Sequence, residues 1–224
     1  MKRSLDVKHL VAVVIPGNWG FFPYGWVEKE KKLLNDIGIK AIGTGRMPDP
    51  IFARSYVWFE YIKEGLKGAG VCNSGKRVIL IGTSTGSLAV MNFVKDCSDA
   101  ELPLAIVLMN TYPSPQSVKP KFPLSILRPL LVKVEEMGMY FPIDYKRLRK
   151  VPITVIASSD DDEFISKEDT DWMIHNLQPR VYIDSNMITH CSYEGGHDSI
   201  IENHLKSVNG LLISCLKTYG VTGL

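Results

Sequence analysis

The chain has 224 residues, of which 45% are hydrophobic and 22% charged, and its 26 basic and 24 acidic side chains leave a formal net charge of +2. This composition is that of a globular chain with a full core, and the length predicts a single domain over residues 1–224. The near balance of charge gives no general basis for binding nucleic acid or an anionic membrane surface.

Short apolar runs alternate along the chain with longer amphipathic segments. In chain order we expect a strand at 10–15, a helix at 26–37, a strand at 39–43, a helix at 51–66, a strand at 78–81, a helix beginning with 87–94, strands at 105–109 and 153–157, a sixth strand within 181–191, and a closing helix at 198–219. Continuously apolar strands separated by helices indicate a mostly parallel sheet that is covered on both faces.

The segment 110–150 interrupts this alternation. It carries six prolines, so most of it cannot form one continuous helix. Long irregular segments in compact domains often cover sites. We therefore expect either an elaborate loop or a small cap over a site.

The cysteines give no sign of a metal site or a disulfide framework. None stands in a C-x-x-C pair or has His or Asp at a metal-ligand spacing; they are Cys72, Cys97, Cys191 and Cys215. We expect reduced thiols, no metal, and a protein of the cytoplasm, with the nucleus as the alternative. The apolar run at 10–15 is too short for a secretory signal, and no run reaches the length of a membrane span.

One serine lies between two glycines where a predicted strand meets a predicted helix, in "ILIGTSTGSLAV" at 79–90. Gly82-Thr83-Ser84-Thr85-Gly86 fits G-x-S-x-G, the pattern of a nucleophile elbow. A sharp turn exposes the serine oxygen at the carboxyl edge of the sheet, and glycines two residues away on either side avoid steric clashes. The alternative is a tight turn whose serine only caps the next helix.

An activated serine needs a base, and the base needs an acid that orients it. At an elbow of this kind the acid follows the serine in the chain, and the histidine comes last. The strand at 153–157 runs into "SSDDDEF", where we select Asp162 as the acid and keep Asp161 as the alternative. His197, in "EGGHDS" before the closing helix, is the expected base. The remaining histidines are less well placed relative to the predicted strand ends: His9, His175, His190 and His204.

An oxyanion hole requires two backbone N–H groups that point at the developing negative charge. We expect one from Thr85, directly after the serine. The other is expected from Asn18, in the loop "PGNWG" after the first strand. The alternative for that loop is an ordinary turn, because Pro, Gly and Asn are common turn residues.

With these residues in place, the chain resembles the serine hydrolases related to retinoblastoma-binding protein nine, within the α/β-hydrolase superfamily. The matched stretches run through nearly the whole chain: "VIPGN" at 14–18, "YGWV" at 24–27, "MPDPIFAR" at 47–54, "IGTSTG" at 81–86, "AIVL" at 105–108, "SDDDEF" at 159–164 and "GGH" at 195–197. The resemblance implies a compact α/β-hydrolase domain without the two antiparallel strands that open the full fold. It also implies a triad of Ser84, Asp162 and His197 that hydrolyses esters or amides without a cofactor.

Some features depart from that family. Bulky Trp19 and Phe21 follow the expected oxyanion residue, Glu163 stands where the family often has proline, and 110–150 looks longer than usual. The region "GLKGAGVCNSGK" lacks the Leu-x-Cys-x-Glu segment linked to retinoblastoma-protein binding, so that partner is not expected.

We therefore expect small ester or amide substrates with an apolar acyl side, because aromatic residues gather near the expected rim: Trp19, Phe21, Phe22 and Tyr112. The rival hypothesis is a protein-binding module with a weakly active or vestigial triad. Acyl transfer or thioester cleavage at the same serine would use the same residues and stays open.

Overall fold

The computed structural model describes residues 5–17, 25–44, 55–68, 70–71, 77–111, 113, 143–177 and 186–224. Six of the described strands form one sheet in the order β3-β2-β4-β5-β6-β7, and every neighbouring pair is parallel. The strands are β2 (Leu10–Ile15), β3 (Lys40–Gly43), β4 (Arg77–Thr83), β5 (Ala105–Met109), β6 (Ile153–Ser159) and β7 (Met187–Tyr193). The predicted six-stranded parallel sheet is confirmed.

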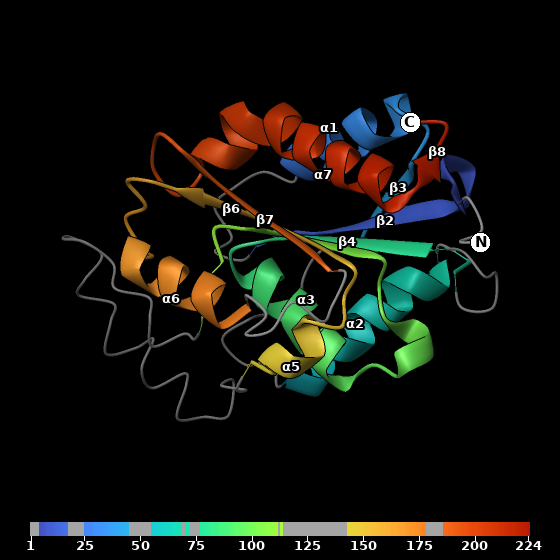
Figure 1. The fold of residues 1–224 in the computed structure, drawn as a ribbon, viewed down its shortest axis with the longest axis horizontal. Helices are drawn as coiled ribbons and strands as arrows, with labels where there is room; N and C mark the ends of the chain where they lie inside the picture. The colour runs from blue at the N-terminus through green and yellow to red at the C-terminus, as the bar shows by residue number, and fades with distance from the viewer. Residues whose placement is uncertain are drawn as a thin grey trace.

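Helices cover both faces of the sheet (Figure 1). On one face lie α1 (Gly25–Asp36) and α7 (Leu205–Tyr219), and on the other lie α2 (Ser55–Gly68), α3 (Thr85–Asp96), α5 (Tyr145–Leu148) and α6 (Lys167–Leu177). Short helical turns complete the described helices: η1 (Val7–His9), η2 (Asp99–Glu101) and the π-helical turn η6 (Ile200–His204) directly before α7.

The core consists of two layers, one on each side of the sheet. Strand β2 contributes Val11, Val13 and Ile15 to the layer under α2 and α3, and the alternate residues to the layer under α1 and α7. All six residues of β2 are buried, which explains why the strand has no polar alternation. Burying one such Val, Leu or Ile side chain contributes about 1.5–3 kcal/mol.

The sequence did not predict a second, smaller sheet, in which β1 (Leu5–Asp6) pairs with β8 (Val221–Thr222). Two-residue strands carry no hydrophobic period, so only their spatial meeting reveals them. The pairing brings the two ends of the described chain together (Figure 1). Of the main-sheet strands within the described residues, β2, β3 and β4 lie at or before the predicted elbow.

Several predicted boundaries differ from the structure by one or more residues. Strand β7 extends to Tyr193, two residues beyond the predicted limit, and the closing helix begins with the π-helical turn η6. Within 110–150 the structure describes 110–111, 113 and 143–150, where α5 is a single turn. The rest of the predicted cap lies outside the described residues, so the cap and the single-domain boundary stay predictions.

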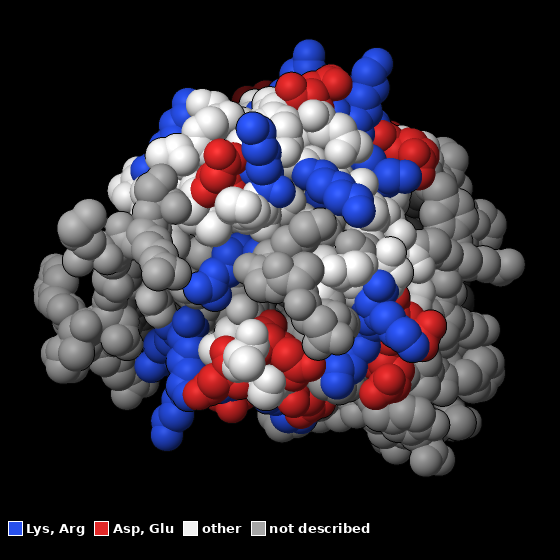
Figure 2. Space-filling model, turned by 90° about the vertical axis from the view of Figure 1, so that its right-hand side faces the viewer, with Lys and Arg blue, Asp and Glu red and all other residues white. Residues whose placement is uncertain are grey.

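The charges on the described surface agree with the near balance of basic and acidic residues in the sequence. On the face shown in Figure 2, basic and acidic side chains are interspersed over the described residues. None of the helices in the described part of the chain is both long enough and apolar enough to cross a bilayer.

Candidate active site

The topology brings four polar chain segments to the carboxyl edge of the sheet. Because the strands are parallel, the residues that follow them meet at this one edge. Ser84 follows β4, Asn110 follows β5, Asp162 follows β6 and His197 follows β7, and these are consecutive strands in the sheet.

Ser84 lies on a strained turn between β4 and α3. Its backbone has φ 52° and ψ −124°, a conformation that residues other than glycine rarely adopt. Its N–H donates to Met109 O on the neighbouring strand at 2.8 Å, which ties the turn to the sheet. The Ser84 side chain makes no capping hydrogen bond to α3, so the alternative of a simple helix cap is wrong.

The two glycines of the motif allow this turn to form. A Cβ atom on Gly82 would lie 2.5 Å from Gly86 O, and one on Gly86 would lie 2.5 Å from Ile15 O. Separations this short require the backbone itself to move. A Cβ atom on Gly17 would lie 3.0 Å from Ser84 Cβ, so the loop after β2 runs directly beside the serine.

Asp162 and His197 form a buried, hydrogen-bonded pair at the same edge of the sheet as this turn. His197 Nδ1 lies 2.7 Å from Asp162 Oδ2, and the side chains are 14% and 3% exposed. The other carboxylate oxygen accepts the N–H groups of Phe164 at 2.8 Å and Ile165 at 2.9 Å. These bonds fix the carboxylate as an acceptor, so Nδ1 carries the proton and Nε2 is the nitrogen left to accept one.

The surroundings also raise the basicity of His197. Burial alone lowers the pKa of the imidazole, but the hydrogen bond and charge of Asp162, followed by the charges of Asp198 and Glu163, raise it above its usual value. The Phe164 ring meets the imidazole edge-on at a centroid distance of 5.1 Å.

The alternative acid, Asp161, which the structure also describes, is not hydrogen-bonded to the imidazole. Its side chain is exposed, and its N–H donates to Gly195 O at 3.2 Å.

Two side chains that the sequence did not single out contact the backbone of His197. Glu163 Oε2 accepts the His197 N–H at 2.8 Å, and Asn110 Nδ2 donates to the His197 carbonyl oxygen. The position of each in the sequence places it at the carboxyl edge of the predicted sheet. Asn110 is the first residue after a buried strand, and Glu163 directly follows the predicted acid.

Not every predicted residue is brought into contact. Ser84 Oγ and His197, both described, are not hydrogen-bonded to each other here; catalytic hydrogen bonds often tighten only with substrate bound. Thr85 begins α3 directly after Ser84. The other predicted oxyanion residue, Asn18, lies outside the described residues, as do the aromatic residues of the expected rim: Trp19, Phe21, Phe22 and Tyr112.

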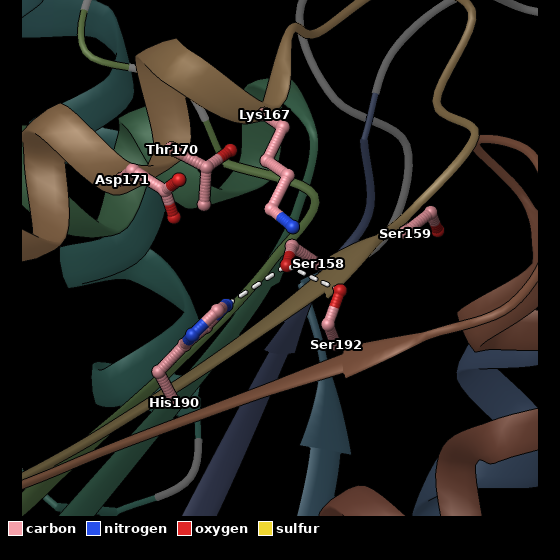
Figure 3. Close-up of a pocket in the computed structure, with 7 residues that line it drawn as sticks. All are labelled: Ser158, Ser159, Lys167, Thr170, Asp171, His190 and Ser192. Atoms are coloured by element: carbon pink, nitrogen blue, oxygen red, sulfur yellow. Dashed lines mark hydrogen bonds between the residues drawn. The ribbon is translucent and has the colours of Figure 1, made fainter.

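A second group of polar side chains lies between α6 and the ends of β6 and β7 (Figure 3). It lines a pocket of about 100 Å³ formed by Ser158, Ser159, Lys167, Thr170, Asp171, His190 and Ser192. Ser192 Oγ donates to Asp160 Oδ1 and, at 3.5 Å, accepts from Ser158 Oγ. Ser158 Oγ can then accept from His190 Nε2 at 2.9 Å, in a chain of bonds that ends at the loop carrying Asp162.

The other described histidines and cysteines lie outside the Asp162–His197 pair. His9 is in η1, His175 in α6 and His190 in β7, while His204 in η6 stacks on Tyr193 at 4.6 Å. Cys97, Cys191 and Cys215 are free thiols, and Cys72 lies outside the described residues. Within the described ranges, no three His, Cys, Asp or Glu side chains gather as metal ligands.

Comparison with known proteins supports the resemblance that the sequence indicated. No protein-family model matches the chain. The chain is 30% identical over 106 residues to the serine hydrolase RBBP9 of Rattus norvegicus, and the match covers 46% of this chain and 51% of that protein. The chain thus spans about half the length of this curated relative.

Solved structures match over nearly the whole chain. The ydeN gene product of B. subtilis has a TM-score of 0.66 at 16% identity, covering 92% of this chain and 98% of that one. The Pyrococcus furiosus esterase Pf2001 has a TM-score of 0.63 at 12% identity, covering 94% and 83%. Est1E from Butyrivibrio proteoclasticus has a TM-score of 0.61 at 13% identity, covering 92% and 88%. The fold is that of the α/β-hydrolases, as predicted.

Proposed function

We propose that the chain is a serine hydrolase that cleaves small carboxylic esters or amides through an acyl-enzyme on Ser84. The observation that carries the proposal is the buried hydrogen bond between His197 Nδ1 and Asp162 Oδ2, at the same sheet edge as the strained Ser84 turn. A serine hydrolase and several esterases among the similar proteins support the same reaction class.

In the proposed cycle, Ser84 Oγ attacks the acyl carbon while His197 Nε2 takes the hydroxyl proton. Asp162 holds the Nδ1 proton and stabilises the imidazolium. The N–H groups of Thr85 and Asn18 are assigned to the oxyanion of the tetrahedral intermediate. The imidazolium then gives its proton to the departing alcohol or amine, and an acyl ester on Ser84 remains.

The second half of the cycle repeats these roles with water. His197 takes a proton from water as the water oxygen attacks the acyl ester, and it returns that proton to Ser84 Oγ as the acid leaves. Every step is an acyl or proton transfer between groups named here, so the proposed cycle requires no cofactor. The preference for an apolar acyl group rests on the sequence positions of the rim aromatics.

The test is labelling by a fluorophosphonate probe together with turnover of p-nitrophenyl acetate. We expect labelling and turnover in the wild type and neither in Ser84→Ala or His197→Ala. Matched controls are Ser207→Ala and His175→Ala, which change exposed residues on α7 and α6 and should behave as the wild type. Absence of labelling and turnover in the wild type, or undiminished turnover in Ser84→Ala, would overturn the proposal.

A further inference from the structure

We propose that Asn110 and Glu163 are positioning residues that hold His197 by both of its backbone polar groups. Asn110 binds the carbonyl oxygen and Glu163 binds the N–H, while Asp162 binds the ring. Three side chains from the ends of β5 and β6 thus fix one residue of the loop after β7. This inference rests on the proposed hydrolysis at Ser84.

The contact with Glu163 depends on the sequence of both loops. Oε2 accepts the His197 N–H at 2.8 Å, across 34 positions in the chain. A Cβ atom on Gly196 would lie 2.6 Å from the same oxygen, so a side chain at this position would displace the carboxylate. Consecutive residues, Asp162 and Glu163, therefore bind the ring and the backbone of one histidine.

Asn110 connects the acid strand with the histidine loop. Its side chain donates through Nδ2 to His197 O, and its Oδ1 accepts the Ser159 N–H at 2.9 Å. Its own N–H donates to Ala157 O at 2.8 Å. The preceding residue, Met109, accepts the Ser84 N–H, so two successive residues contact the loops of the nucleophile and the base. Asn110 has φ 45°, a left-handed conformation that asparagine tolerates better than most residues.

This arrangement has a consequence for catalysis. With its N–H, carbonyl and Nδ1 all bound, His197 keeps little freedom to shift away from Ser84. A misplacement of about 1 Å in a reacting group can reduce the rate about 100-fold. Glu163 also acts through its charge, which raises the pKa of the imidazole together with the charges of Asp162 and Asp198. Substitutions at Glu163 can separate the effect of its hydrogen bond from the effect of its charge.

Glu163→Gln keeps an acceptor oxygen for the His197 N–H and removes the charge, whereas Glu163→Ala removes both. We expect Glu163→Ala to reduce kcat about 10- to 100-fold with a smaller change in KM. Glu163→Gln should retain most of kcat, and in both variants the rising limb of kcat/KM against pH should move to lower pH. The matched control is Glu194→Gln, an exposed carboxylate in the histidine loop, which should change neither kcat nor the pH profile.

Asn110→Asp preserves the acceptor for the Ser159 N–H but turns a carboxylate oxygen toward the His197 carbonyl. The negatively charged carboxylate oxygen would then repel the partly negative carbonyl oxygen of His197, and we expect kcat to fall about 10- to 100-fold. The matched control is Asn203→Asp, an exposed position in η6, which should leave kcat unchanged. Circular dichroism and the thermal midpoint verify that each variant is folded.

A measurement without turnover completes the test. The imidazole of His197 is titrated by NMR in the wild type, Glu163→Gln and Glu194→Gln, and a lower midpoint in Glu163→Gln alone supports the contact. Wild-type kcat in folded Glu163→Ala and Asn110→Asp, or an unshifted midpoint in Glu163→Gln, would overturn the inference. Failure of the proposed function is a different result, namely no Ser84-dependent turnover in the wild type.

Discussion

Glu30 is a carboxyl group buried between α1 and α7, and its replacement by glutamine should stabilise the protein at neutral and alkaline pH. The residue is 1% exposed, and Oε2 accepts a hydrogen bond from Asn209 Nδ2 at 3.0 Å. Burial raises the pKa of Glu30 from 4.5 to about 7, although the Asn209 bond and the charge of Lys29 lower it. The folded protein therefore favours the protonated, neutral side chain.

The size of the effect follows from proton linkage. Between the unfolded pKa of 4.5 and the folded pKa of about 7, the folded state binds more protons, so the free energy of unfolding falls as pH rises. One pKa unit corresponds to about 1.36 kcal/mol, so this shift removes about 3 kcal/mol once the pH exceeds the folded pKa. Glutamine reproduces the acceptor and donor of the protonated acid and does not ionise.

Urea unfolding of the wild type and Glu30→Gln at roughly pH 5 and pH 8.5 measures this difference. We expect the variant to gain about 1 kcal/mol or less at the lower pH and about 3 kcal/mol at the higher pH. The matched control is Glu28→Gln on the same helix, where the exposed carboxylate pairs with Lys31 at 2.8 Å. Losing that surface pair should cost less than about 1 kcal/mol. An equal effect of Glu30→Gln at both pH values would refute the reasoning.

Other predictions follow from the elbow, the base and the core. Gly86→Ala should abolish fluorophosphonate labelling, because its Cβ would lie 2.5 Å from Ile15 O; labelling at the wild-type rate would contradict this. The rising limb of kcat/KM should have its midpoint above 6.5, because the pKa of His197 is raised and only the neutral ring accepts the proton; a midpoint below 6.5 would argue against His197 as the base. Leu212→Ala, at a fully buried site in α7, should reduce the free energy of unfolding by about 2–5 kcal/mol in urea titrations, and an unchanged stability would contradict the core packing described here.

The fold was predictable because its signals are local. Strand β5 spans Ala105–Met109, as its apolar run predicts, and the turn at Ser84 was marked by glycines that lie within two residues of it. The pairing of β1 with β8 was not predictable in this way. It joins residues more than 200 positions apart, and neither strand contains a periodic pattern.

In the candidate site, too, local features of the sequence were predictable and long-range contacts were not. Residue type and position after a strand were enough to propose Ser84 and His197 and to place the acid in the loop after β6, with Asp162 preferred and Asp161 as the alternative. The contacts of Asn110 and Glu163 with His197 could not be read from the sequence, because they join residues 87 and 34 positions apart and depend on side chains that turn toward a backbone. Such contacts become visible only when the strand order and the loop conformations are known.

The register between β6 and β7 explains why Asp162, rather than Asp161, meets His197. Ser159 pairs with Tyr193 at the last position of the two strands. The pairing then continues into the loops, where the Asp160 N–H donates to Tyr193 O and the Asp161 N–H donates to Gly195 O. This ladder uses the backbone of Asp161 and leaves its side chain exposed, while the next residue turns its carboxylate inward to the imidazole. Sequence spacing cannot choose between adjacent aspartates, because the choice depends on the register of a strand that begins 25 residues after Asp162.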